Sequence, residues 1–216
     1  MVSLENQFEY WDSVASSKTF THPFAFDRFC SLVPRTAHIL DLGCGYGRTC
    51  NELYRNGYQN ITGVDSSQKM IERGRKAYPF LCLKTWKGNH LPCDSEVFEA
   101  VILFAVLTCI PTDIGQKFLI NEIDRVLLPE GIIYISDYWL QNDDRNRTRY
   151  KAFQNKYGTY GVFELPEGTV VRHHEKEWIS SLLADFSELD LFDLEVVTMN
   201  GNISSGFQYI GKKRSV

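Results

Sequence analysis

The sequence predicts an α/β fold, built on a doubly wound, mostly parallel sheet of seven strands with a final antiparallel strand and a lid insertion. Short β-branched or apolar segments alternate with helical patterns from Ala37 onward, which is typical of parallel strands joined by right-handed helical crossovers. The chain has 216 residues, of which 44% are hydrophobic and 13% aromatic. These values suit one domain, 1–216, with a core large enough to fold alone.

The first five expected strands alternate with helices. The strands are expected at 38–42, 61–64, 81–86, 100–105 and 132–136. Residues 100–105 are continuously apolar, as expected of a central strand buried on both faces. The helices are expected at 48–56, at 66–77 with Ser66 or Ser67 as its N-cap, and at 114–127, before a turn at 129–131.

The flanking segments follow different patterns. Residues 1–35 are expected to form a helical cap over the carboxyl edge of the sheet, with the aromatic cluster TFTHPF facing inward. Residues 141–174 are polar and aromatic, and we interpret them as a charged helix followed by a loop that forms a lid. A helix at 176–186 and an antiparallel pair at 194–199 and 206–211 complete the expected order.

Composition argues against several classes of partner. Lys and Arg total 23 against 27 Asp and Glu, for a formal charge of -4, and no basic stripe is interleaved with aromatics. Binding to nucleic acid is therefore disfavoured. No segment approaches the ~20 apolar residues of a membrane span, and the start resembles no leader, so we expect a cytoplasmic protein without a membrane partner. The spacing of the six cysteines favours neither disulfides nor a metal site.

The motif ILDLGCGYGRTCNEL is the strongest local signal. A strand ending in Asp41 leads directly into Gly43, Gly45 and Gly47 and then a helix. Glycine allows a tight turn there and lets a ligand approach where a Cβ would collide. A plain turn between strand and helix would explain the glycines equally well, so the motif needs a second observation.

That second observation is Asp65, which ends the next strand about 20 residues after the glycines. A carboxylate there can accept hydrogen bonds from both hydroxyls of a ribose, which indicates a nucleoside-containing ligand. A nicotinamide dinucleotide needs the spacing G-x-G-x-x-G, but position 48 is Arg. Asp41 also suits an amino group better than a phosphate, so an adenosine carrying an amino acid is favoured.

Four separated segments, DLGCGYG, GVDSSQKMIERGR, KGNHLPCDSEVFEAVILFAVLTCIP and LINEIDRVLLPEGIIYISDY, resemble the class I S-adenosylmethionine-dependent methyltransferases with small-molecule methyltransferase domains. The resemblance implies their Rossmann-like methyltransferase fold, S-adenosylmethionine as cofactor and S-adenosylhomocysteine as product. It covers residues 36–137 closely. It implies contacts to the methionine from Asp41, Gly43, Cys44, Gly45, Phe104 and Ala105, to the ribose from Asp65, and to the adenine from Ser66, Met70, Gly88, Asn89 and His90.

Two features accompany this resemblance. The family commonly has Asp where this chain has Asn89, whose side-chain carbonyl can still accept a hydrogen bond from the adenine amino group. From the residues themselves, Tyr10 and Trp11 can close over the cofactor, although an N-terminal helix packed by its aromatics would look the same.

The expected reaction is an in-line displacement that moves a methyl group to a nitrogen, oxygen or sulfur atom of a small molecule. His173 and His174 follow the expected lid and can take a proton at neutral pH. Tyr157 and Tyr160 can contact an acceptor through a hydrogen bond or the ring face. Packing roles explain all four residues as well. Cys109 is expected to line the pocket rather than act as a nucleophile.

Other functions stay open at this stage. A catalytically inactive cofactor-binding or partner-binding domain of the same fold would carry the same motifs. A nicotinamide-dependent oxidoreductase is disfavoured by Arg48 and by the lack of a Tyr-x-x-x-Lys pair. Methylation of proteins or RNA is disfavoured because no acceptor-docking domain and no paired-cysteine motif are found.

Overall fold

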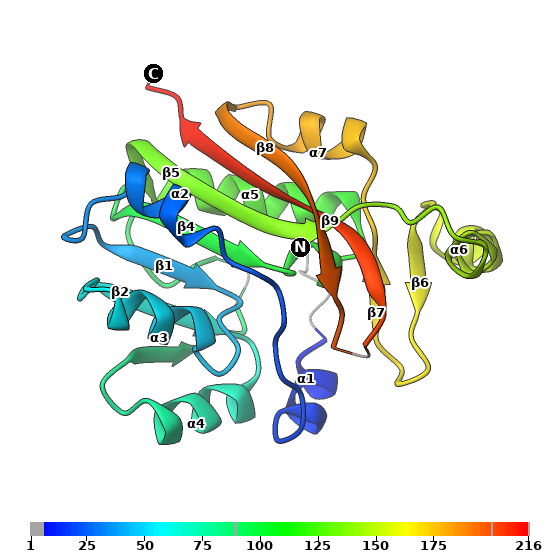
Figure 1. Cartoon of the computed structure of the whole chain (residues 1–216), viewed down its shortest axis with the longest axis horizontal. Coiled ribbons are helices and arrows are strands. Elements are labelled where there is room, and N and C mark those ends of the chain that lie inside the picture. The colour runs from blue at the N-terminus through cyan, green and yellow to red at the C-terminus, as the bar shows by residue number, and fades with distance from the viewer. Residues whose placement is uncertain (1–6, 89, 200, 216) are drawn as a thin grey trace.

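The computed structural model describes residues 7–88, 90–199 and 201–215. Its main sheet has seven strands in the order β3-β2-β1-β4-β5-β9-β8 (Figure 1). Strands β3 to β5 pair in parallel, whereas β9 is antiparallel to both of its neighbours, so the predicted sheet is confirmed. The strands are β1 (Ile39–Leu42), β2 (Ile61–Asp65), β3 (Cys82–Thr85), β4 (Phe98–Phe104), β5 (Leu127–Tyr138), β8 (Phe186–Val197) and β9 (Ile203–Lys213).

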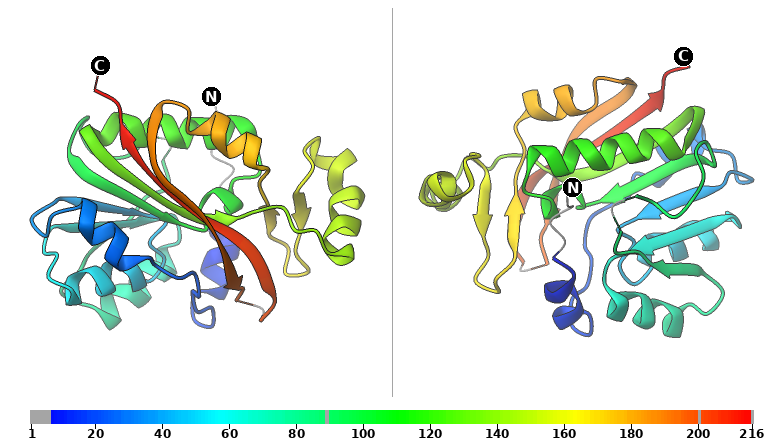
Figure 2. Two further views of the ribbon diagram at one scale, coloured as in Figure 1. Left: turned by 45° about the horizontal axis from the view of Figure 1, so that its top comes forward. Right: turned by 180° about the vertical axis from the view of Figure 1, so that it is seen from behind.

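Helices cover both faces of this sheet (Figure 2). One face packs against α2 (Phe26–Leu32), α3 (Arg48–Arg55) and α4 (Gln68–Ala77), and the other against α5 (Asp113–Val126) and α7 (Lys176–Leu182). The hydroxyl oxygen of Ser67 accepts from the amide of Met70, which fixes the start of α4 as expected for an N-cap. The interleaved strands and helices therefore bury a core on each side of the sheet.

The N-terminal segment lies at the carboxyl edge of the sheet. Helix α1 (Phe8–Val14) is tied to α4 because Asp12 accepts from the Ser67 hydroxyl at 2.5 Å and from the Lys69 amide at 3.0 Å. Residues 18–25, called the strap below, then cross the glycine loop. The sequence predicts that residues 1–35 cover the carboxyl edge, but helix α2 covers a face of the sheet instead, where Phe29 packs beside Tyr134.

The segment expected as a lid contains more regular structure than its sequence suggests. The charged helix is present as α6 (Asp144–Tyr157), and a two-stranded sheet of β6 (Val162–Glu164) and β7 (Val170–Arg172) replaces the expected loop. Figure 1 shows α6 beyond the β8–β9 side of the sheet, on the opposite side from α3 and α4.

Three element boundaries differ from expectation. Strand β5 begins at Leu127, and the expected turn survives as an irregularity between the pairs Phe98–Leu127 and Ala100–Ile132. Strands β8 and β9 extend well beyond the predicted pair. Alternating acidic and apolar residues make β8 a half-exposed edge strand, whereas β9 is mostly buried between β5 and β8. Helix α7 accordingly ends at Leu182, before β8 begins. Among the described residues, no helix has the length and apolar character needed to cross a membrane.

We predict that Gly74→Ala destabilises the fold, although alanine is normally the better helix former. A Cβ at Gly74 would lie 2.8 Å from the carbonyl oxygen of Tyr46 and 2.6 Å from Leu83 Cδ1. We expect the free energy of unfolding to fall by roughly 1–3 kcal/mol, as for other overpacked sites. Urea unfolding measures it, with Lys76→Ala on the exposed face of the same helix as control. Unchanged or raised stability for Gly74→Ala would contradict this packing.

Candidate functional site

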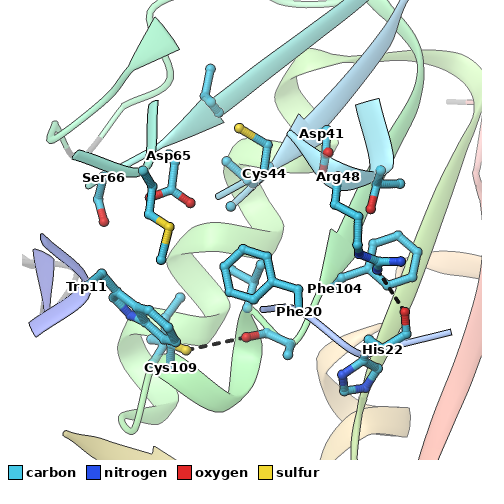
Figure 3. A pocket seen from close by; sticks show the side chains of 18 of the residues that line it. Trp11, Phe20, His22, Asp41, Cys44, Arg48, Asp65, Ser66, Phe104 and Cys109 are labelled. Carbon is cyan, nitrogen blue, oxygen red and sulfur yellow. Dashed lines mark hydrogen bonds between the residues drawn. The ribbon is translucent and has the colours of Figure 1, made fainter. Parts of the chain in front are cut away.

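A cavity opens at the carboxyl ends of the central strands (Figure 3). It is bordered by Asp41 and Leu42 of β1, by Val64 and Asp65 of β2, by Phe104 of β4, and by Tyr138 of β5. The strand order reverses between β1 and β4, and open α/β sheets bind ligands at that reversal. The topology thus places the candidate site where this class of sheet holds small molecules.

The glycine loop forms the floor of the cavity because its backbone takes conformations that glycine favours. Gly43 has φ of +75° and Gly45 has φ of +54°. A Cβ on Gly43 would lie 2.5 Å from Val106, and one on Gly45 would lie 2.0 Å from the ring of Phe20. The loop therefore depends on glycine both for its turn and for the close approach of groups above it.

Asp65 joins the glycine loop to the start of α4. Its two carboxylate oxygens accept from the amides of Gly45 and Ser67, each at 2.8 Å. Burial raises the pKa of Asp65 to about 6, against the opposing effect of these hydrogen bonds. Because each oxygen keeps a further lone pair, this carboxylate can still accept hydrogen bonds from a ligand in the cavity.

Asp41 is a second buried carboxylate in the cavity wall. The Cys50 thiol donates to its Oδ2 at 3.1 Å. Burial raises the pKa of Asp41 to about 6, and the charge of Arg48 opposes that rise. Asp41 can therefore bind the positively charged amino group of an amino-acid ligand.

The strap and α1 roof the cavity. Phe20 stacks on Tyr46 with ring centroids 5.1 Å apart, and Trp11 meets Phe20 edge-on. The backbone carbonyl of His22 accepts from Arg48 at 2.8 Å, and the amide of Ala25 donates to Tyr134 at 3.0 Å. Aromatic packing and hydrogen bonds to the domain body thus hold the strap in place.

The end of the cavity over β5 is formed by His22 and Tyr138, whose rings meet edge-on with centroids 4.7 Å apart. His22 is only 4% exposed. Burial and, to a smaller extent, the charge of Arg48 lower the pKa of His22 to about 4. A hydrogen bond to the backbone of Asp137 opposes both effects. The imidazole is therefore neutral at physiological pH.

Cys109 also lines the cavity, as expected, and its surroundings do not activate it. Its thiol donates to the carbonyl of Ala105 at 3.3 Å. Burial raises the pKa of Cys109, and the charges of Asp137 and Asp65 raise it further. A thiol in this state is a poor nucleophile.

The predicted cofactor residues largely meet in this one cavity. Gly45 contributes its amide to Asp65, Tyr10 packs against Trp11, and His90 turns away to pair with Glu122. Asn89 lies outside the described residues. Those that line the cavity are Trp11, Asp41, Gly43, Cys44, Asp65, Ser66, Met70, Gly88, Phe104 and Ala105.

The four candidate catalytic residues are placed elsewhere, and none is among the described residues that line the cavity. His173 Nδ1 bonds the Tyr150 hydroxyl at 2.6 Å. His174 accepts from Gln116 at 2.9 Å and donates to the carbonyl of Tyr138 at 3.1 Å. Burial lowers the pKa of both histidines. The Tyr157 hydroxyl donates to Glu164, and the Tyr160 ring meets Tyr150.

The expected lid likewise contributes no residue to the cavity lining in the described part of the chain. Gln7 lies between the cavity and the expected lid, since its side-chain amide donates to the carbonyl of Cys109, which lines the cavity, and to that of Val170 in β7. The cavity is instead covered by the strap, α1 and Met199 at the end of the β8–β9 ribbon. These segments take the place that the sequence suggested for residues 141–174.

Sequence reasoning assigned no role in the cavity to several of its lining residues, among them Gln7, Phe20, His22, Tyr138 and Met199. For Phe20 and His22 the cluster TFTHPF carried a signal, because a histidine among buried aromatics needs a reason to be there. Gln7, Tyr138 and Met199 stand in no local motif. Only the folded chain brings them to the cavity.

Comparison with known proteins agrees with this geometry. Residues 40–135 match the family model described as a methyltransferase domain. A structure of an S-adenosylmethionine-dependent methyltransferase from Methanosarcina mazei superposes with a TM-score of 0.84 at 23% identity, covering 90% of this chain and 100% of that one. At that identity, the likeness supports the fold.

Two curated relatives are similar over part of their length. Methyltransferase-like protein 27 of Homo sapiens is 35% identical over 77 residues, which cover 35% of this chain and 31% of that protein. Carboxy-S-adenosyl-L-methionine synthase of Dichelobacter nodosus is 31% identical over 128 residues, covering 56% of this chain and 53% of that protein. The chain thus spans about half or less of the relatives it matches.

Proposed function

We propose that this chain is a class I S-adenosylmethionine-dependent methyltransferase that transfers a methyl group from S-adenosylmethionine to an oxygen, nitrogen or sulfur atom of a small molecule. The match of residues 40–135 to a methyltransferase-domain model supports this proposal. One observation carries the proposal. The half-buried Asp65 carboxylate lines the cavity while it holds the glycine loop by its hydrogen bond to Gly45.

The residues of the cavity fit this cofactor. Asp65 is placed to accept from the ribose hydroxyls, with Ser66 and Met70 beside the adenine. Asp41 and the glycine loop suit the amino-acid end, because a Cβ at Gly43 would already meet Val106. The cofactor supplies an electrophilic methyl group on a sulfonium. The chain binds and orients the reactants and keeps water from them. Alignment of two reactants alone can supply an effective molarity of roughly 10⁵–10⁸ M.

The roof over the cavity supports a small acceptor. The strap and α1 cover the glycine loop, and Phe20 and Trp11 stand between the loop and solvent. A protein or RNA side group would have to displace this roof to reach the cofactor. A free small molecule needs only to fit beneath it, which is the arrangement most ligand pockets show.

We predict that Asp65→Ala weakens the binding of S-adenosylhomocysteine by roughly 10–100-fold, because hydrogen bonds to a charged group contribute about 1.5–3 kcal/mol. Isothermal titration calorimetry measures the dissociation constant. Asp124→Asn, at a carboxylate paired with Lys213 outside the cavity, serves as control and should bind as the wild type does.

Asp65 also holds two backbone amides, so each variant needs a melting temperature measured without ligand. Asp65→Asn keeps one acceptor oxygen and separates loss of charge from loss of the loop. Unchanged affinity in a folded Asp65→Ala protein would refute the assignment. Binding of NADH by the wild type would point to the nicotinamide alternative.

We predict that acid weakens S-adenosylhomocysteine binding below about pH 6. Burial raises the pKa of both Asp65 and Asp41 to about 6, so each carboxylate is ionised at pH 7.5 and about nine-tenths protonated at pH 5. Binding that needs one ionised carboxylate weakens about tenfold over that interval, and more if it needs both. Titrations at several pH values test this. Affinity that is flat from pH 5 to 7.5 would contradict the role of these carboxylates.

We predict that the chain labels at least one metabolite when it is incubated with [methyl-³H]S-adenosylmethionine and the low-molecular-weight fraction of a cell extract. An inactive cofactor-binding domain of the same fold would bind the cofactor and label none. The low-molecular-weight fraction is obtained by ultrafiltration, and the protein retained by the filter provides a matched pool of macromolecular acceptors. Label confined to that pool would refute a small-molecule acceptor.

A further inference from the structure

His22 lines the cavity, and its ring keeps an unused hydrogen-bond acceptor. Its Nε2 is buried and has no hydrogen-bond partner among the described residues, while the backbone of Asp137 engages the ring. A buried polar atom without a partner costs about 1–3 kcal/mol. Since the imidazole is neutral and lines the cavity, a ligand that donates a hydrogen bond to Nε2 would remove that cost.

The position of His22 assigns it to the acceptor rather than to the cofactor. Asp65 ends β2, and His22 lies against Tyr138 at the end of β5, with β1 and β4 between them. Strands lie about 4.8 Å apart, so these ends of the cavity are separated by roughly 14 Å. Figure 3 shows Asp65 and Ser66 at one side and His22 beside Arg48 and Phe104 at the other. A nucleoside held by Asp65 would therefore lie far from His22, which leaves the His22 end of the cavity for the acceptor.

Arg48 places a positive charge beside His22. Its Nη2 donates to the carbonyl of His22, and its guanidinium lies 5.7 Å from the centroid of the Phe104 ring. Its Nε is buried and lacks a hydrogen-bond partner in the described structure, while its Nη1 forms a long ion pair of 3.8 Å with Glu52. An anionic oxygen at this end would find a cation within a mostly apolar wall.

We propose that His22 and Arg48 form the acceptor subsite and that the acceptor is a small molecule with an acidic hydroxyl, of the phenol or enol class. The inference rests on the methyl transfer proposed above. The hydroxyl donates its hydrogen bond to His22 Nε2, and its oxygen lone pair forms the bond to the methyl carbon. The carbon–sulfur bond breaks with its electron pair on sulfur, and the hydroxyl proton passes to Nε2 and then to solvent.

The charges at this end favour a hydroxyl over an amine. Aliphatic amines are protonated at neutral pH, and Arg48 repels such a cation. A phenol or enol instead gains negative charge on oxygen as its proton leaves, which Arg48 stabilises. Because burial and Arg48 hold the pKa of His22 at about 4, this imidazole takes a proton only from a hydroxyl that the site has made acidic. The rings of Phe104 and Tyr138 suit a flat, conjugated body.

Two aromatic probes test the acceptor class: 4-nitrophenol carries an acidic hydroxyl, and 4-nitrobenzylamine carries an aliphatic amine that is protonated at neutral pH. Each is incubated with the wild-type chain and [methyl-³H]S-adenosylmethionine, with 1,3-cyclohexanedione as an enol probe. We expect label in the two hydroxyl compounds at a rate at least about tenfold above the amine, a difference of about 1.4 kcal/mol in barrier.

The variants test the two side chains. His22→Gln keeps a hydrogen-bond acceptor but takes no proton, so kcat should fall roughly 100-fold with KM changed less than about threefold. His22→Ala should raise KM as well. His38→Gln, at a histidine outside the cavity that contacts Thr62, should leave both constants unchanged.

A binding measurement gives a readout without turnover. The phenolate of 4-nitrophenol absorbs visible light and its protonated form does not, so its spectrum reports ionisation in the complex with S-adenosylhomocysteine. We expect the wild type to raise the phenolate fraction at a fixed pH and Arg48→Met to abolish that rise.

The outcomes separate the two proposals. A wild type that fails to bind S-adenosylhomocysteine refutes the proposed function itself. If that binding is intact, then preference for the amine, no transfer to either hydroxyl probe, or an unaffected kcat in folded His22→Gln overturns the acceptor assignment alone. Melting temperatures and S-adenosylhomocysteine affinity within about threefold of wild type confirm that each variant is folded.

Discussion

The candidate site depends on one half-buried carboxylate. Asp65 accepts an amide hydrogen bond from the glycine loop and another from the start of α4, so it joins two loops that follow different strands. The amides of Gly43 and Cys44 also donate to the carbonyl of Val64, which ties the glycine loop to β2. Asp65 presents its remaining lone pairs to the cavity from this edge. The residue that shapes the site is thus also the residue expected to bind the ribose.

Burial disfavours the charged form of each acid and base in and beside the cavity. It raises the pKa of Asp65 and Asp41 to about 6 and that of the neighbouring Asp137 to about 7, and it lowers the pKa of His22 to about 4. At pH 7.5 Asp65 and Asp41 are therefore still ionised, whereas His22 is neutral. A bound cation can pair there with an aspartate, and a developing anion with Arg48, and little water is present to screen either interaction.

The parts that could be predicted from the sequence are those encoded locally. The strand containing Asp41, the glycine turn and the strand ending in Asp65 each have their own pattern of apolar residues and turn formers. The covering of the site is encoded only in part, since the cluster TFTHPF predicts inward-facing aromatics but no pattern gives their partners. Phe20 and His22 reach the cavity because the strap folds back over the loop, and Met199 arrives on the long β8–β9 ribbon. The charged segment 141–174 looked like a lid, yet its buried histidines bond to Tyr150 and Gln116 instead.

This division between local and distant contacts explains where family likeness ends. The matched region, residues 40–135, contains Asp41, Asp65 and Phe104, and it therefore includes the part of the cavity suited to the cofactor. His22 precedes that region, and Tyr138 and Met199 follow it. A cofactor shared across a family constrains the strand ends that bind it, whereas an acceptor contacts whatever segments fold over them. The chemistry of the acceptor is therefore to be read from the strap and the end of β5.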